Sequence, residues 1–103
     1  MRGIKGKVTI VTGGAGGIGS FAIQYAHGLG CTVATTAGTP EKLALCRELG
    51  AQIALDYHDD WVAALKEATG GRGVDVILDI MGAKYLPLNV KALAMDGRQV
   101  TIG

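Results

Sequence analysis

Residues 8–19 read Val-Thr-Ile-Val-Thr-Gly-Gly-Ala-Gly-Gly-Ile-Gly, an apolar run that passes directly into a glycine-rich turn. The run is typical of a buried β-strand. The turn has the spacing G-x-G-x-x-G and opens a predicted helix over 17–27. Glycines there permit a tight turn and a close backbone approach, and the first N–H groups of a helix lack partners within it. The stretch therefore predicts a strand–turn–helix unit that binds a dinucleotide pyrophosphate through Gly14, Gly16, Gly17, Ile18 and Gly19.

Short apolar runs alternate with helix-length segments along the rest of the chain, which is the pattern of a parallel sheet built from βαβ units. The predicted strands are Val8–Thr12, Thr32–Thr36, Gln52–Leu55, Val74–Asp79 and Gln99–Ile102. Right-handed crossovers between them predict an α/β fold: a Rossmann-type, doubly wound parallel sheet of five strands in the order 3-2-1-4-5, with helices on both faces.

Four helices are expected between these strands. The second has the clearest boundaries, with Thr39 as N-cap, Pro40 in the first turn and Gly50 just past its end. The third opens near Asp59 and stops at 70–71, and the fourth covers 84–94 before an Asp96–Gly97 turn. The residues expected to face the core are Phe21, Ala22, Ile23, Ala26 and Leu29 in the first helix, Trp61 or Val62 with Leu65 in the third, and Leu86, Val90 and Leu93 in the fourth.

Composition narrows the class of protein. The chain has 103 residues, enough for one domain over 1–103, with 49% hydrophobic residues, 18% charged residues and a net charge of +1. That balance argues against a nucleic-acid partner, and no apolar stretch is long enough for a membrane span. Cys31 and Cys46 have neither disulfide nor metal-ligand spacing, so we expect no metal site and a reducing, cytoplasmic location.

The residues after the second predicted strand bear on the choice of cofactor. Sites that prefer NAD usually place an Asp or Glu there to bind the ribose 2′-hydroxyl, but 35–39 reads Thr-Thr-Ala-Gly-Thr. Lys42 follows one turn into the next helix, within reach of a 2′-phosphate, which favours NADP(H). The alternative is that Lys42 is a solvated surface lysine of that helix.

Several further motifs resemble the cofactor domain of the medium-chain dehydrogenases/reductases, nearest to the zinc-free quinone oxidoreductases. They are Gly38-Thr39-Pro40-Glu41-Lys42-Leu43, Leu49-Gly50-Ala51, Asp56-Tyr57, Gly70-Gly71-Arg72-Gly73-Val74-Asp75, Leu78-Asp79, Gly82 and Gly97-Arg98. The resemblance covers about 8–103. It implies that NADPH contacts Gly16, Gly17, Ile18, Gly38, Lys42 and Tyr57, and that Met81, Gly82, Ile102 and Gly103 line the adenosine and nicotinamide paths.

The chain departs from that family at Asp56-Tyr57-His58, where the family usually has Asn-Tyr-Arg or Asn-Tyr-Lys. Tyr57 also has the alternative role of an amphipathic surface ring. The opening 6–13 resembles short-chain dehydrogenases as well, but none of the three tyrosines has a lysine at the Tyr-x-x-x-Lys offset that their proton transfer requires.

The resemblance implies the NADP(H)-binding domain of a zinc-free, NADPH-dependent quinone or carbonyl oxidoreductase whose separate substrate domain is absent. We expect no catalytic residue within these residues and little or no activity from the chain alone. Two alternatives stay open: an excised, ancestral-like or designed Rossmann scaffold without activity, and a short-chain reductase fragment. The fifth strand is expected to present a bare edge through which two copies pair as a homodimer.

Overall fold

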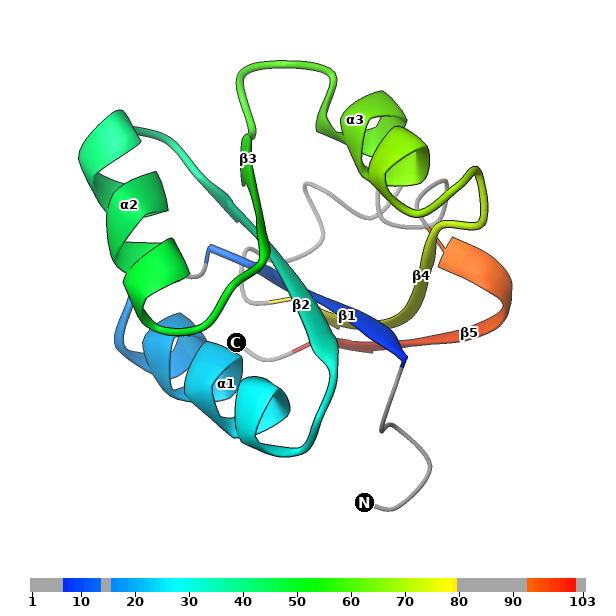
Figure 1. Cartoon of the computed structure of the whole chain (residues 1–103), viewed down its shortest axis with the longest axis horizontal. Helices are drawn as coiled ribbons and strands as arrows, with labels where there is room; N and C mark the ends of the chain where they lie inside the picture. Colours follow the sequence, from blue (N-terminus) through cyan, green and yellow to red (C-terminus); the bar gives the residue numbers. More distant parts are fainter. Residues whose placement is uncertain (1–6, 14–15, 80–92, 102–103) are drawn as a thin grey trace.

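The computed structural model describes residues 7–13, 16–79 and 93–101, and Figure 1 shows a twisted parallel sheet with helices on both sides. Strands β1 (Val8–Thr12), β2 (Thr32–Ala37), β3 (Ile53–Asp56) and β4 (Val74–Asp79) lie in the order β3-β2-β1-β4, and β5 (Leu93–Thr101) pairs with β4. All four pairings are parallel. The predicted α/β class and its Rossmann-type parallel sheet are therefore confirmed.

The described helices are α1 (Gly17–Gly28), α2 (Pro40–Glu48) and α3 (Trp61–Ala68). The predicted start of α2 is confirmed: the Thr39 hydroxyl oxygen accepts from the backbone N–H of Lys42 at 3.2 Å, and Pro40 opens the helix. Helix α3 begins slightly later than predicted, because Asp60 rather than Asp59 is its N-cap and accepts from the N–H of Ala63. In both helices one polar side chain sets the first turn.

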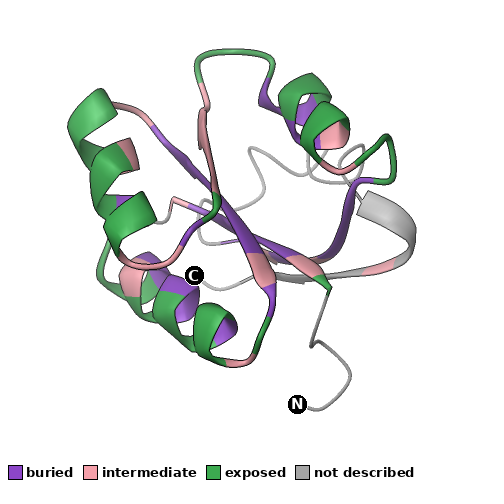
Figure 2. Cartoon of the chain, in the orientation of Figure 1, coloured by how far each residue is buried: buried purple, intermediate pink, exposed green. Residues whose placement is uncertain are grey.

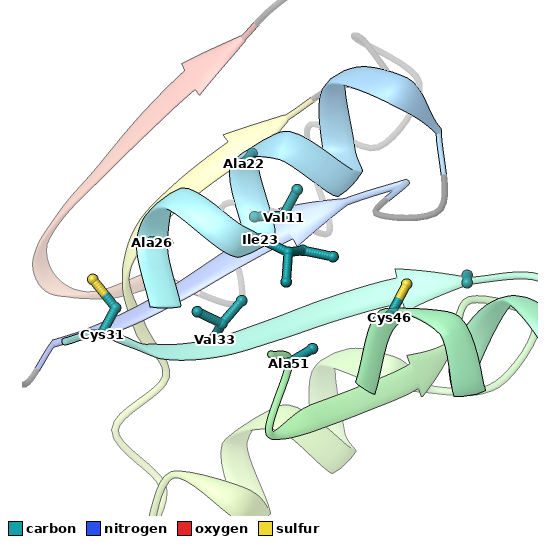
Figure 3. Close-up of a cluster of buried hydrophobic side chains, with 9 residues drawn as sticks. Val11, Ala22, Ile23, Ala26, Cys31, Val33, Cys46 and Ala51 are labelled. Carbon is teal, nitrogen blue, oxygen red and sulfur yellow. The ribbon is translucent and has the colours of Figure 1, made fainter. Parts of the chain in front are cut away.

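One face of the sheet packs against α1 and α2. Figure 3 shows the small and branched side chains that meet there, which come from β1, β2, both helices and the turns beside them: Val11, Ala22, Ile23, Ala26, Cys31, Val33, Ala37, Cys46 and Ala51. Because α1 meets the sheet through alanines and one isoleucine, the helix lies close to β1 and β2. Both cysteines are buried in this cluster.

The opposite face packs against α3. Trp61, Val62 and Leu65 all point inward, so the sequence alternative between Trp61 and Val62 resolves to both. They meet Ile10, Ala34, Val74 and Ile77 of the sheet. Figure 2 shows the consequence, with buried residues along the strands and exposed residues on the outer sides of the helices. Over the described residues, no helix has both the length and the apolarity needed to cross a membrane.

The prediction that Phe21 belongs to the buried side of α1 is wrong, because its side chain is 69% exposed. The helix instead turns Gly19, Ala22, Ile23 and Ala26 toward the sheet. Phe21 lies on the flank of the helix and stacks on Tyr25, one turn later, with 6.1 Å between nearly parallel rings. Both rings remain largely exposed.

Strand β5 also corrects the sequence expectations. It begins at Leu93, so the predicted helix over 84–94 does not extend to Ala94, and the predicted Asp96–Gly97 turn lies within the strand. Leu93 pairs with Val74 but Arg98 pairs with Val76, so β5 carries extra residues between these two pairings. The pairing of β5 with β4 is therefore irregular between Val74 and Val76, and the predicted turn residues lie in this irregular part. The rest of the predicted helix lies outside the described residues.

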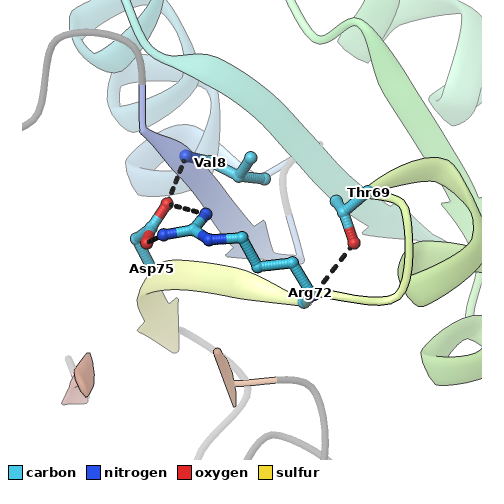
Figure 4. A network of polar contacts seen from close by, with 5 residues as sticks. Val8, Thr69, Arg72 and Asp75 are labelled. Carbon is cyan, nitrogen blue, oxygen red and sulfur yellow. Dashed lines mark hydrogen bonds and ion pairs between the residues drawn. The ribbon is translucent and has the colours of Figure 1, made fainter. Parts of the chain in front are cut away.

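A polar cluster ties the amino ends of β1 and β4 together (Figure 4). The buried Asp75 carboxylate accepts from the Val8 backbone N–H at 2.9 Å and from both terminal nitrogens of the Arg72 guanidinium. In the turn before β4, the Thr69 hydroxyl oxygen accepts from the N–H of Gly73. These contacts lie at the edge of the sheet opposite the glycine-rich turn, so they stabilise the strands away from the candidate site.

Candidate functional site

The carboxyl ends of the parallel strands form one edge of the sheet, and β1 lies at its centre. Register places Thr12 beside Asp79 of β4, and Ala37 of β2 beside Asp56 of β3. The chain runs outward from β1 to β2 and β3 and then crosses back to β4, so strand order reverses at β1. In open α/β sheets ligands bind outside the carboxyl ends at such a reversal. The glycine-rich turn leaves β1 at this point.

The turn delivers the start of α1 to that edge. Gly13 has φ of 69°, a left-handed conformation that glycine adopts without strain, and its carbonyl accepts from the N–H of Gly16 at 3.3 Å. Gly16 is the N-cap, and no side chain caps this end of the helix in the described structure. Gly16, Gly17 and Ile18 are exposed while Gly19 is buried against the sheet. Gly14 lies outside the described residues.

This end of α1 can therefore receive an anion. The first N–H groups of a helix have no partner within it, and the helix dipole adds positive potential there. A Cβ built on Gly17 would have nothing within 4 Å, so the described residues leave space directly over the first turn. An exposed helix start of this kind is a common place for phosphate groups to bind to backbone N–H groups.

The structure brings two further predicted residues together at the ends of β2 and β3. The Tyr57 N–H donates to the Ala37 carbonyl at 3.2 Å, which brings the Tyr57 ring over Gly38. A Cβ built on Gly38 would lie only 2.4 Å from the Tyr57 hydroxyl oxygen, so this close approach requires glycine. Lys42 is exposed in the first turn of α2, which follows Gly38 and Thr39. We call the end of β2 with Gly38, Lys42 and Tyr57 the β2 corner.

Asp56 and His58 form a pair around Tyr57. The Asp56 Oδ1 accepts from the His58 backbone N–H at 2.9 Å and lies 2.8 Å from the His58 Nδ1. The His58 ring lies against the Tyr57 ring with 4.5 Å between centroids. The backbone hydrogen bond, then the ring hydrogen bond, lower the pKa of the Asp56 carboxyl, so it is charged at neutral pH. The carboxylate nearest the β2 corner is thus already engaged.

Two buried polar contacts beneath the glycine-rich turn, made by Thr12 and Thr36, were not expected from the sequence. Thr12 donates from its hydroxyl to the Asp79 Oδ1 at 2.9 Å, and both residues are buried. The Thr36 hydroxyl oxygen accepts from the Gly13 N–H at 3.3 Å. A signal was present: Thr12 and Asp79 end β1 and β4, and Thr36 stands next to the last residue of β2. Strand period alone, however, cannot show which of them face one another.

Other expected site residues remain untested. Met81, Gly82, Ile102 and Gly103 lie outside the described residues. Within 7–13, 16–79 and 93–101, no group of three or more His, Cys, Asp or Glu side chains lies together in a way that could hold a metal ion. The described part of the chain therefore offers no donor set that fits zinc.

The chain is similar in sequence and in fold to known proteins. A family model described as zinc-binding dehydrogenase matches residues 17–103. Prostaglandin reductase-3 of Bos taurus is 35% identical over 99 residues, covering 96% of this chain and 26% of that protein. The crystal structure of 2-haloacrylate reductase superposes with a TM-score of 0.93 at 33% identity, covering 97% of this chain and 31% of that one. The Escherichia coli quinone oxidoreductase complexed with NADPH gives a TM-score of 0.91 at 33% identity, covering 98% and 32%.

The chain spans between a quarter and a third of the length of these relatives. The family match nevertheless covers most of the residues of this chain. On these grounds the chain belongs to the medium-chain dehydrogenase/reductase family.

Proposed function

We propose that this chain binds NADP(H) as the cofactor-binding part of a zinc-free oxidoreductase that reduces a quinone or an activated carbonyl compound. The observation that carries the proposal is the start of α1 at the carboxyl edge of the central strand. This helix end follows a glycine-rich turn, is exposed, and is capped by no side chain of the residues that the structure describes. The solved relative that carries NADPH supports the choice of ligand. The bound nicotinamide would supply the hydride, and the chain would hold and orient it.

The pyrophosphate would lie against the N–H groups of Gly17 and Ile18, with Gly14, Gly16 and Gly19 allowing the close approach. The pyrophosphate is common to both dinucleotides, so this part of the site serves NAD(H) and NADP(H) equally. The choice between them would be made at the β2 corner, where the ribose 2′ position lies in this fold.

Two features of that corner favour NADP(H), and a third serves either dinucleotide. Gly38 and its neighbours supply no carboxylate at the end of β2 for a ribose 2′-hydroxyl. The exposed Lys42 can approach a 2′-phosphate from α2. The Tyr57 ring lies over Gly38 and can pack against the adenosine ribose. Met81, Gly82, Ile102 and Gly103 are proposed to line the rest of the cofactor path.

The Asp56–His58 pair affects how strongly the β2 corner would bind a 2′-phosphate. Asp56 is charged, which disfavours a 2′-phosphate, but its Oδ1 is held by His58. We therefore expect Asp56→Asn to strengthen NADPH binding severalfold while NADH binding stays constant. Parallel calorimetric titrations with both cofactors measure this. An equal change for both cofactors would show that Asp56 acts on the fold rather than on the 2′ position.

Titration calorimetry at neutral pH tests the proposal itself. We expect saturable binding of both dinucleotides, with NADPH at least about tenfold tighter, because a phosphate contact with a cation is a charge-assisted hydrogen bond. Lys42→Ala should remove most of that preference and leave NADH affinity unchanged. Lys7→Ala is the matched control, since Lys7 is exposed, precedes β1 and lies at the opposite edge of the sheet.

The outcomes separate the alternatives. A folded chain that binds neither dinucleotide would favour a scaffold without a ligand and would overturn the proposal. Preference for NADH, or equal losses from the two lysine substitutions, would overturn the assignment of NADP(H) and Lys42.

We also propose that two copies pair along the outer edge of β5, the last strand in the sheet order. A terminal strand offers backbone N–H and C=O groups to another strand. Sedimentation velocity over a hundredfold concentration range should show a monomer–dimer equilibrium, and a single monomeric species throughout would refute it. We propose the reducing cytoplasm as the location, because Cys31 and Cys46 lack the spacing of a disulfide framework.

A further inference from the structure

Side chains from two neighbouring strands hold the residues at which β1 becomes the glycine-rich turn. Gly13, the first residue of the turn, donates its N–H to the Thr36 hydroxyl oxygen of β2. Thr12, the residue before it, donates its hydroxyl to Asp79 of β4. Thr12, Thr36 and Asp79 are at most 3% exposed, so water does not compete freely for these bonds.

The two contacts differ in what they reach. The Thr12–Asp79 bond links two strands that already pair through their backbones. The Thr36 bond reaches the turn itself, because Gly13 follows the last residue of β1 and its carbonyl receives the N–H of Gly16, the N-cap of α1. Thr36 is thus two contacts from the N–H groups that would face a pyrophosphate.

From this geometry we infer that Thr36 is a positioning residue for the pyrophosphate-binding turn, an inference that rests on the proposed binding of NADP(H). Backbone donors bind an anion well only when they are held near the productive geometry before the ligand arrives. A turn that is fixed in advance also loses less conformational entropy on binding. The Thr36 hydroxyl fixes the Gly13 peptide, whose left-handed φ sets the direction in which the chain leaves β1.

The test replaces the hydroxyl without changing side-chain shape. Thr36→Val should weaken NADPH binding by between about twofold and tenfold, the range that corresponds to one net hydrogen bond. Thr36→Ser, which restores a hydroxyl, should recover most of the affinity. Thr35→Val is the matched control: Thr35 is the adjacent β2 residue, is fully buried, and donates to the Val11 carbonyl rather than to the turn.

Two readouts separate positioning from general stability. Adenosine 2′-monophosphate lacks the pyrophosphate, so its affinity should be equal in the unchanged chain and in Thr36→Val. The Gly13 amide should exchange its hydrogen faster in Thr36→Val than in Thr35→Val, with or without ligand, because only the first variant removes its acceptor.

Each result counts for or against the inference. Unchanged NADPH affinity in Thr36→Val, an equal loss in Thr35→Val, or an equal loss for adenosine 2′-monophosphate would overturn it while leaving the proposed function intact. If the unchanged, folded chain binds no NADPH, the proposed function fails and the positioning role fails with it.

Discussion

Replacing Asp75 by Asn tests the polar cluster that joins β1 to β4. The carboxylate of Asp75 is 7% exposed and accepts from the Val8 N–H and from the Arg72 guanidinium, and the substitution removes its charge while keeping its shape. Hydrogen bonds to charged groups contribute about 1.5 to 3 kcal/mol. The lower end applies because the Arg72 side chain is 55% exposed and solvent screens its share.

A loss of about 1.5 kcal/mol corresponds to a fall in Tm of roughly 6 to 12 °C for a domain of this size. Urea unfolding followed by circular dichroism at neutral pH measures the free energy directly. Arg72→Gln is the control, and it should cost less than Asp75→Asn because Asp75 would keep its charge and its bond to Val8.

The same variant carries a pH signature. The Arg72 hydrogen bonds, with help from the Val8 N–H, lower the pKa of the Asp75 carboxyl in the folded state. A carboxyl of lowered pKa binds protons more weakly when folded, so its contribution to stability is present above its unfolded pKa of about 3.9 and is lost as pH falls through the folded value. The difference between the unchanged chain and Asp75→Asn should therefore be constant from pH 7 to about 5 and shrink below about pH 4. A difference that is absent at pH 7, or that persists undiminished into acid, would refute this account.

Two further predictions concern packing and the cofactor corner. Leu65→Ala should lower the free energy of unfolding by about 2 to 5 kcal/mol, since Leu65 is fully buried against the sheet. Leu45→Ala, at a residue that is 42% exposed, should lower it by well under half of that amount. Denaturant midpoints compare the two variants, and equal losses would contradict the observed packing. Gly38→Ala should force the Tyr57 ring aside, because the new Cβ would meet its hydroxyl at 2.4 Å. It should weaken NADPH binding with little change in Tm, and unchanged affinity by calorimetry would mean that Tyr57 does not contact the cofactor.

Much of the fold could be predicted because its signals are local. Strands β1 and β4 have the predicted bounds, since each is a short run rich in Val and Ile between turn residues. The start of α2 was predictable because Thr39 and Pro40 act within one turn of the chain. The location of the glycine-rich turn followed from the same local logic.

The parts that could not be predicted depend on contacts between distant segments. Phe21 and Ile23 are equally apolar, and only the sheet beneath α1 decides that Ile23 is buried and Phe21 exposed. The residues Thr36 and Gly13 are 23 positions apart in the sequence, and the type of neither residue predicts that the two make contact. The Asp96–Gly97 pair is a strong turn signal, but it lies within β5, between the residues Leu93 and Arg98 that pair with β4.

The two cores share a single layer of backbone, and this has a consequence for insertions and deletions. Consecutive residues of the central strands serve opposite cores: Val11 and Val33 pack with α1 and α2, while Ile10 and Ala34 pack with α3. Removing one residue from the middle of β1 would move every later side chain of that strand to the opposite face of the sheet, so both cores would be disrupted together. Length changes should therefore be tolerated at the amino-edge turns and rejected inside β1 and β2, whatever the chemistry of the residue lost.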